Sequence, residues 1–270
     1  MKKKIFKIFG YAAAAMSLLA VGFGGAFWLD DKKSEISQPE EIVQTVQENP
    51  ITYSLENETR ELSDASVSQQ DEVPKEIGEV PFTSQAPLGD WNPDQFQNGC
   101  EEASILMATL WAKGKEMPVA AKAQGEISVI GNESRKLFGH VIDTSAEDTQ
   151  KMWVAYAPNI KTFFKKNPTA KDIKEEIRKG NIVITPASGR ELGNRFYTAP
   201  GPITHMLVIY GFDEATGEFI TNDPGTKNGK GYRYKEAVLL AALWNYPTAS
   251  KHATPPPSGK RPTAMLVVEK

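Results

Sequence analysis

The chain has 270 residues, of which 40% are hydrophobic and 24% are charged, and its formal net charge is −3. This balance is ordinary for a globular protein of one or two domains, and it excludes a collagen-like chain, a low-complexity chain and a multi-span membrane protein. The single cysteine excludes an intramolecular disulfide framework and any multi-cysteine metal site, and the lack of a basic excess gives no indication of nucleic acid as a partner.

The charge is distributed unevenly along the chain. Residues 1–29 carry a net charge of +4, residues 30–78 carry −9, and residues 79–270 carry +2. The sequence therefore divides into a basic apolar head, an acidic middle and a near-neutral body.

The head combines a basic start with a long apolar run. Four lysines lie within the first seven residues, and residues 8–29 carry no charge. About 22 apolar residues are enough to span a bilayer as one helix, and the lysines then stay on the cytoplasmic side. We predict a signal anchor over 1–29 that holds the rest of the chain outside the cell membrane, with Trp28 at the interface. A cleaved signal peptide, which would release a secreted protein, is the alternative.

The middle segment, residues 30–78, has the composition of a flexible linker. It is rich in Glu, Gln, Ser, Asn and Thr and poor in aromatic residues. Such a composition buries too little apolar surface to offset the entropy lost on ordering the chain. We therefore predict an acidic disordered linker that joins the head to the body, residues 79–270.

The first half of the body is predicted to hold a buried helix. A short strand is predicted at 80–83 and a polar loop at 90–99. From Cys100 to Gly114, apolar residues recur at helical spacing, at Ala103, Leu106, Met107, Leu110 and Trp111. This periodicity is typical of a helix that packs on a core. The only cysteine therefore lies in the first turn of a predicted buried helix, directly after a glycine.

The second half of the body alternates helices with strands. Ser145 is a predicted cap for a helix over 146–156, and the Thr169–Asp172 capping box opens a helix that Gly180 ends. A strand is predicted at 181–185, where Pro186 ends it, and further strands are predicted at 203–210, 218–221 and 265–268. Residues 211–217 are predicted to connect two of them as a hairpin. A further helix is predicted within 232–243. A helix followed by mostly antiparallel strands indicates an α+β fold.

Three residue types in this arrangement point to thiol chemistry. A thiolate nucleophile needs a lowered pKa, access from solvent and a nearby base. The positive end of a helix favours the thiolate at Cys100. If strands 206–210 and 218–221 pair as a hairpin, His205 and Asp223 lie near the same end, where the carboxylate can orient the imidazole. The pattern therefore predicts a Cys-His-Asp site.

Simpler interpretations of these residues stay open. A single cysteine is most often a small buried hydrophobe, and Asn-Asp-Pro-Gly is a common turn sequence. The charges of Glu101 and Glu102 oppose a thiolate at Cys100, unless their side chains point away from the sulfur. An oxyanion site needs a donor beside the backbone N–H of the nucleophile, and three upstream residues offer one: Gln85, Gln95 and Gln97.

Four short segments follow one another in an informative order: Val80-Pro-Phe-Thr-Ser-Gln85, Gly99-Cys-Glu-Glu-Ala-Ser104, His205-Met-Leu-Val-Ile209 and Asn222-Asp-Pro-Gly-Thr226. In this order, over roughly 79–245, the chain resembles the bacteriocin-leader-peptidase-like group of papain-fold cysteine peptidases. The resemblance implies a papain-like fold, in which an N-terminal helix carrying the nucleophile packs on an antiparallel sheet.

The resemblance also implies a role for each matching residue. Cys100 is the implied nucleophile, His205 the base and later the acid, and Asp223 the group that orients the imidazole. Gln85 matches the group's Ser-Gln segment and is the implied oxyanion donor, with Gln95 or Gln97 as alternatives because the stretch before Cys100 is long. The chain departs from the group at Glu101-Glu102, where many members have Gly-Pro.

A long polar loop at 189–202 precedes His205, and in papain-like folds such a loop lines the cleft. Arg190 is therefore a candidate for binding a substrate carboxylate or the substrate backbone. His140 and His252 lie in predicted loops without comparable partners, and we expect both to be solvated. Three scattered histidines do not indicate a metal site.

The sequence as a whole predicts an extracytoplasmic, membrane-tethered cysteine peptidase. It would hydrolyse a peptide or protein at the cell surface through an acyl-enzyme, and we expect no cofactor, metal or nucleotide. A nucleotide is not expected because the glycines of 225–231 lack the strand and helix that flank a phosphate-binding loop. The alternatives are a catalytically inactive peptide-binding domain on the same fold, and an acyltransferase or cell-wall amide hydrolase that uses the same triad.

Overall fold

The computed structural model describes residues 77–248 and 256–270. The predicted signal anchor and almost all of the predicted linker lie outside these ranges, as does His252. Among the described residues, none of the helices combines the length and the hydropathy that a bilayer-spanning segment needs.

Within the described ranges, six strands form one antiparallel sheet in the order β1-β6-β2-β3-β4-β5. The strands are β1 Thr162–Lys166, β2 Ile182–Ala187, β3 His205–Asp213, β4 Glu218–Asn222, β5 Tyr232–Lys235 and β6 Ala264–Val268. The helices are α1 Asp94–Gln97, α2 Cys100–Ala112, α3 Ala120–Phe138, α4 Ala146–Tyr156, α5 Ala170–Arg178, α6 Gly189–Leu192 and α7 Glu236–Ala242.

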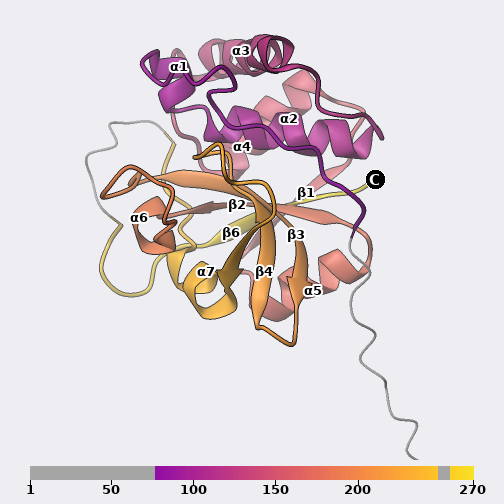
Figure 1. The fold of residues 1–270 in the computed structure, drawn as a ribbon, viewed down its shortest axis with the longest axis vertical. Coiled ribbons are helices and arrows are strands. Elements are labelled where there is room, and N and C mark those ends of the chain that lie inside the picture. The colour runs from indigo at the N-terminus through magenta and orange to yellow at the C-terminus, as the bar shows by residue number, and fades with distance from the viewer. Residues whose placement is uncertain (1–76, 249–255) are drawn as a thin grey trace, which may run out of the picture. The chain divides into compact units, whose positions relative to one another are not determined.

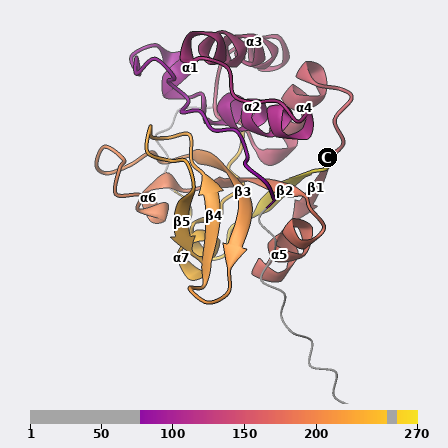
Figure 2. The same cartoon turned by 45° about the vertical axis from the view of Figure 1, so that its right-hand side comes forward.

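The helices form layers on both faces of the sheet. Figure 1 and Figure 2 place α1 to α4 on one side and α5 to α7 on the other. Each side has its own apolar core, because alternate residues of the central strands point to opposite faces. Ile182 and Ile184 of β2 join the core beneath α2, whereas Val183 joins the core with α5 and α7. The predicted combination of helices with an antiparallel sheet is confirmed.

The helix that begins at Cys100 is confirmed, and it lies at the centre of its layer. Almost all of α2 is buried, because it packs on β3 on one side and on α3 on another. A helix that is covered on most sides is apolar nearly all round. Gly99 before it has no room for a side chain, since an added Cβ would lie 2.7 Å from the carbonyl oxygen of Gln95.

Several local predictions are confirmed in detail. Helix α4 begins after Ser145, whose hydroxyl accepts a hydrogen bond from the Asp148 N–H. Helix α5 begins with the complete Thr169–Asp172 capping box, and Gly180 follows it in the left-handed region, at φ 88°. These signals are visible in the sequence because a cap and its partner are only three residues apart.

Other predictions are wrong. Residues 80–83 form no strand. Instead, the Asn222 side-chain amide donates to the carbonyls of Val80 at 3.0 Å and Pro81 at 3.4 Å. Pro186 does not end β2 but lies within it. The β2–β6 pairing stops at Ile184, and beyond it β2 meets only an isolated bridge, where the Pro186 carbonyl accepts from the Trp244 N–H. Proline is therefore tolerated here, outside the regular ladder between β2 and β6.

Five elements in the described part of the chain were not predicted: the short helices α1 and α6 lie in predicted loops, β5 lies at the start of the segment predicted to hold a helix, and α3 and β1 lie where no element was expected. Helix α3 buries Ala123, Ile127 and Ile130, a helical spacing that the sequence does display. Along strand β1, buried and exposed side chains alternate only weakly. Its partner β6 lies about a hundred residues further along the chain.

The predicted hairpin of β3 and β4 is confirmed, and it determines where the site lies. Val208 pairs with Asn222, so the first residue of β3 and the residue after β4 come to the same edge of the sheet. The register shifts at Gly211, where an added Cβ would lie 3.1 Å from the Ile220 side chain.

Candidate active site

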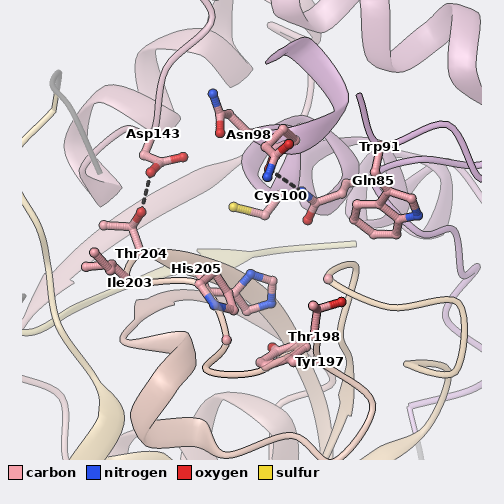
Figure 3. Close-up of a pocket in the computed structure, with 14 residues that line it drawn as sticks. Gln85, Trp91, Asn98, Cys100, Asp143, Tyr197, Thr198, Ile203, Thr204 and His205 are labelled. Carbon is pink, nitrogen blue, oxygen red and sulfur yellow. Dashed lines mark hydrogen bonds between the residues drawn. The ribbon is translucent and has the colours of Figure 1, made fainter. Parts of the chain in front are cut away.

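A cavity of about 490 Å³ opens where three segments converge: the start of α2, the loop that leads into β3, and the turn after β4. Cys100, His205 and Gln85 line it, together with Trp91 and Asp143. Figure 3 shows the Cys100 side chain and the His205 ring facing the same space. The structure therefore brings the predicted cysteine and histidine to one cavity.

Cys100 is the first residue of α2 and is only 3% exposed. Its thiol donates a hydrogen bond to Glu101 Oε2 at 3.0 Å. Burial, and then the negative charges of Glu101 and Asp143, raise the pKa of the Cys100 thiol well above its ordinary value. In this arrangement the sulfur is a protonated donor, and the helix end does not overcome the acidic surroundings.

Glu101 points toward the sulfur, which settles the question that the sequence left open. Its other oxygen accepts hydrogen bonds from the Thr144 N–H at 2.9 Å and from the Tyr246 hydroxyl at 2.8 Å. Burial, followed by repulsion from Asp143, raises the pKa of Glu101 to about 7. Glu102 points elsewhere, and burial, followed by repulsion from Glu101, raises the pKa of its carboxyl well above the ordinary value.

The predicted pair of His205 and Asp223 forms at the sheet edge. His205 Nε2 lies 2.8 Å from Asp223 Oδ1, and both side chains are almost completely buried. Because Nε2 donates to the carboxylate, the lone pair of the neutral ring lies on Nδ1, which is the nitrogen that can accept a proton. The Tyr197 ring packs edge-on against the imidazole, with centroids 5.5 Å apart.

Asp223 is held by more groups than the sequence indicates. Its Oδ2 accepts from Tyr197 at 2.6 Å, Tyr234 at 2.5 Å and Asn194 at 2.9 Å. Burial opposes its ionisation, but the attraction of His205 and these hydrogen bonds outweigh burial and lower the pKa of Asp223 below its ordinary range. None of the three supporting residues was predicted, because no local pattern connects them to Asp223.

Gln85 lies beside Cys100, but its amide hydrogens are already used. Gln85 Nε2 donates to the carbonyls of Phe96 at 3.0 Å and Gln97 at 2.8 Å. Its Oε1 is buried without a hydrogen-bond partner in the described part of the chain. Both amide N–H bonds are engaged in this arrangement, and the expected role of Gln85 as an oxyanion donor stays a prediction.

The two alternative donors differ in position. Gln95 is engaged by α3, with its amide nitrogen 2.5 Å from the Ser128 hydroxyl and its oxygen 2.9 Å from Arg135. Gln97 is exposed and lines the cavity. So does Asn98, an amide residue that the sequence reasoning did not consider.

Arg190 is exposed on α6 and is not among the residues that line the cavity. Its Nε donates to the Gly201 carbonyl at 3.3 Å, so it braces the loop whose residues 201–204 do line the cavity. That loop is packed closely, since a Cβ on Gly189 would lie 2.4 Å from the Pro202 ring. The contact places Arg190 behind the cavity wall, and its expected contact with substrate stays a prediction. His140 is exposed, as expected.

One group of side chains has the composition of a metal site. The ligand atoms of Cys100, Glu101 and Asp143 lie within 4.8 Å of one another. In this arrangement the thiol shares its proton with Glu101, and Thr204 donates to Asp143. The set mixes one soft sulfur with two hard carboxylates, and the sulfur here is a protonated donor, whereas a metal is bound by the thiolate.

Replacing Gly225 by alanine is expected to disturb the His205–Asp223 pair. An added Cβ would lie 2.8 Å from His205 Cε1 and 2.9 Å from the Tyr197 ring. Because there is no free space on that side of the ring, we expect the imidazole to move and its bond to Asp223 to weaken, which is measured as a change in the NMR resonances of the His205 ring. Gly125→Ala is the control, since its Cβ would meet nothing within 4 Å. His205 ring resonances that are the same in both variants would contradict the tight fit.

The chain is similar to a known protein family and to solved structures. A family model described as the Peptidase C39-like family matches residues 77–252. Among solved structures, a Bacillus anthracis protein described as a C39-like peptidase matches with a TM-score of 0.42 and 13% identity, over 71% of this chain and 95% of that one. No curated protein matches the chain.

Proposed function

The chain belongs to the peptidase C39-like family, and on that basis we propose that it is a cysteine peptidase with Cys100 as nucleophile, His205 as base and Asp223 as the group that orients His205. The observation that carries the proposal is the shared cavity: the chain's one cysteine lines it together with a histidine that is paired with a buried carboxylate. Peptide bonds are the substrate class that the family suggests.

The proposed reaction uses the two histidine nitrogens differently. His205 Nδ1 takes the thiol proton, while Nε2 keeps its bond to Asp223, and the thiolate attacks the peptide carbonyl carbon. The backbone N–H of Cys100, at the start of α2, lacks an intrahelical acceptor and can donate to the resulting oxyanion. The imidazolium then gives its proton to the leaving amine, and water, activated by the same ring, hydrolyses the thioester.

The thiol has to turn away from Glu101 before this step. In the structure its hydrogen bond goes to the carboxylate and not to His205. We propose that this is the resting arrangement, and that a peptide entering the cavity is attacked only after the thiol faces the imidazole. Glu101 then controls how much thiolate forms at a given pH.

Replacing Glu101 by glutamine is expected to make Cys100 more reactive. The change removes a negative charge that raises the pKa of the thiol, and the new amide can donate to a thiolate. We expect the apparent thiol pKa to fall by at least about one unit, so alkylation by iodoacetamide at pH 7 rises roughly tenfold. The measurement is the alkylation rate from pH 5 to pH 10.

The control for this variant is Glu116→Gln, which removes an exposed carboxylate beyond the far end of α2. It should leave the rate profile unchanged. A Glu101→Gln profile that overlays the wild type would mean that Glu101 does not govern the thiol.

Digestion of a defined peptide library tests the proposed activity. The full-length chain, Cys100→Ala and His205→Ala are incubated with the library, and new peptide ends are identified by mass spectrometry. We expect cleavages with the wild type that both variants lack. A wild type that produces no new ends would overturn the proposal.

A second candidate is favoured by one observation. The thiol is buried and bonded to a carboxylate, which suits a peptide-binding domain that has lost catalysis. This candidate predicts slow alkylation that increases only above about pH 8.5, the ordinary thiol pKa, because burial and the neighbouring carboxylates raise the pKa of Cys100. The profile should be the same in the wild type and in His205→Ala. The peptidase candidate predicts a faster phase of alkylation at pH values below about 8.5, and this phase should be lost in His205→Ala.

We also propose that residues 1–29 anchor the peptidase in the cell membrane, with residues 30–78 as an acidic tether and the body outside. The support is the uncharged stretch at 8–29 behind four lysines. After expression in bacteria, the full-length chain should stay in the membrane fraction on alkaline washing, and protease added to intact spheroplasts should degrade its body. Protein found only in the medium would instead indicate a cleaved signal peptide.

A further inference from the structure

A carboxylate lies beside the cysteine on the wall of the cavity. Asp143 lines the cavity and is 8% exposed, and one of its carboxylate oxygens lies within 4.8 Å of the Cys100 sulfur. Figure 3 shows the sulfur on the side of Cys100 that faces Asp143, away from Gln85. A molecule that brings a reactive carbon to the sulfur therefore also comes close to this carboxylate.

The position of the Asp143 carboxylate is tied to the loop that carries the base. The Thr204 hydroxyl donates to Asp143 Oδ2, and Thr204 directly precedes His205. The described residues that line the cavity include neither a lysine nor an arginine. The charged acceptor that this wall offers next to the sulfur is therefore Asp143.

The charge of Asp143 makes the empty site less reactive. After burial and Glu101, it is the next cause that raises the pKa of the Cys100 thiol. A positive charge bound against Asp143 offsets this effect, because an opposite charge nearby reduces the repulsion that a thiolate meets. A cationic substrate therefore brings with it a change that favours attack by the sulfur.

The short distance between Asp143 and the sulfur distinguishes between two kinds of cation. In an amino-terminal residue, the α-amino nitrogen lies two bonds, or about 2.5 Å, from the carbonyl carbon. When that carbon meets the sulfur, the α-ammonium group comes within reach of the Asp143 carboxylate. A lysine side chain carries its charge at the end of a four-carbon stem, well beyond this distance when it is extended. The geometry therefore favours the α-ammonium group.

We propose that Asp143 is a substrate-binding residue that accepts hydrogen bonds from the free α-ammonium group of the residue whose carbonyl carbon Cys100 attacks. The inference rests on the proposed peptidase function and names its substrates, which are peptides cleaved after their amino-terminal residue. The acyl-enzyme is then an aminoacyl thioester. A peptide whose amino terminus is acetylated is a poor substrate, because acetylation removes the charge that Asp143 binds.

The test uses four chloromethyl ketones that label a cysteine. Three share a phenylalanine skeleton: phenylalanine chloromethyl ketone with its free amine, its N-acetyl derivative, and 1-chloro-4-phenylbutan-2-one, which lacks the amine. The fourth is Nα-acetyl-lysine chloromethyl ketone. In each case the Cys100 sulfur bonds to the CH₂ carbon, chloride leaves, and His205 takes the thiol proton.

The rate of labelling at Cys100 is measured by mass spectrometry in the full-length chain at pH 6, below the ordinary α-amino pKa of about 7.7–8.0. Each rate is divided by the rate of the same ketone with glutathione, which removes differences in intrinsic reactivity. The ratio for the free amine over the amine-free ketone is the amine preference.

Two variants make the comparison specific. Asp143→Asn removes the charge and keeps an oxygen that can accept from Thr204. Glu101→Gln is the matched control, because Glu101 is also a carboxylate bonded next to the thiol but is not among the described residues that line the cavity. We expect an amine preference of about tenfold in the wild type and in Glu101→Gln, and a preference near one in Asp143→Asn.

The outcomes separate this inference from the proposed peptidase function. An amine preference that is the same in Asp143→Asn and in the wild type overturns the role of Asp143. A wild type that reacts equally with the free amine and its acetyl derivative also overturns it, as does one that prefers the lysine ketone, which places the cation on a side chain. These comparisons within the wild type keep the inference falsifiable even if Asp143→Asn fails to fold.

The His205→Ala variant decides the fate of the peptidase proposal. Faster labelling of the wild type than of His205→Ala leaves that proposal standing, whatever the amine preference is. If none of the four ketones labels the wild type faster than His205→Ala, the peptidase proposal and this inference fall together.

Discussion

Replacing Cys100 by serine is expected to abolish peptide hydrolysis while leaving the fold intact. A serine hydroxyl is a far weaker nucleophile than a thiolate when the only base is a neutral imidazole, and losing the nucleophile costs at least about 10³-fold in kcat. Cys100 is buried beneath the cavity, and serine has nearly the same volume and can still donate to Glu101. The measurement is kcat on a cleaved peptide, beside a thermal unfolding curve.

The control for the serine variant is Ser104→Ala, a substitution of similar size one turn further along α2 and away from the residues that line the cavity. Its kcat should stay within a fewfold of the wild type. Retention of more than a few per cent of activity by Cys100→Ser, with an unchanged unfolding temperature, would exclude Cys100 as the nucleophile.

Replacing Asp223 by asparagine is expected to lower kcat by about 10³-fold or more. The neutral amide cannot stabilise the imidazolium. Tyr197 and Tyr234 donate to Oδ2, so the oxygen of the new amide is expected to stay with the phenols and its NH₂ to face His205 Nε2. The ring proton then moves to Nδ1, and the nitrogen needed as base is lost. The kcat of the variant is measured from pH 5 to pH 9, and we expect no pH in this range to restore it to the wild-type value.

The same variant should lose part of the acid sensitivity of the fold. The pKa of Asp223 is lower in the folded state than in the unfolded state. Its carboxylate therefore stabilises the fold fully at pH values above the unfolded pKa, which is about 3.9. This stabilisation is lost as the pH falls from there toward the folded-state pKa. In urea unfolding at pH 7, the free energy of unfolding of the wild type should exceed that of Asp223→Asn. At pH 3 the difference between these two free energies should be smaller. A constant gap would mean that the charge of Asp223 does not stabilise the fold.

These expectations depend on a site that sequence reasoning located only in part. Cys100, His205 and Asp223 could be selected because each stands at the boundary of an element with a clear local signal: a helix of regular period, and a hairpin whose register brings strand ends together. Boundaries of this kind follow from contacts between near neighbours in the chain.

The partners of those residues could not be selected in the same way. Tyr197 reaches Asp223 from the loop before β3, and Tyr234 reaches it from β5. Tyr246 reaches Glu101 across 145 positions of sequence. No periodicity or capping rule links such residues, because their contacts exist only once the sheet and the helix layer have packed.

The sequence by itself determined the α+β class, the helix that presents the cysteine, and the hairpin that joins His205 to Asp223. The direction of the Glu101 carboxylate, the polarity of the Gln85 amide and the position of Arg190 behind the cavity wall were decided only by the tertiary structure. The reason is physical: a backbone element follows from local propensity and apolar spacing, whereas a polar side chain turns toward whichever donor or acceptor the packed chain places beside it.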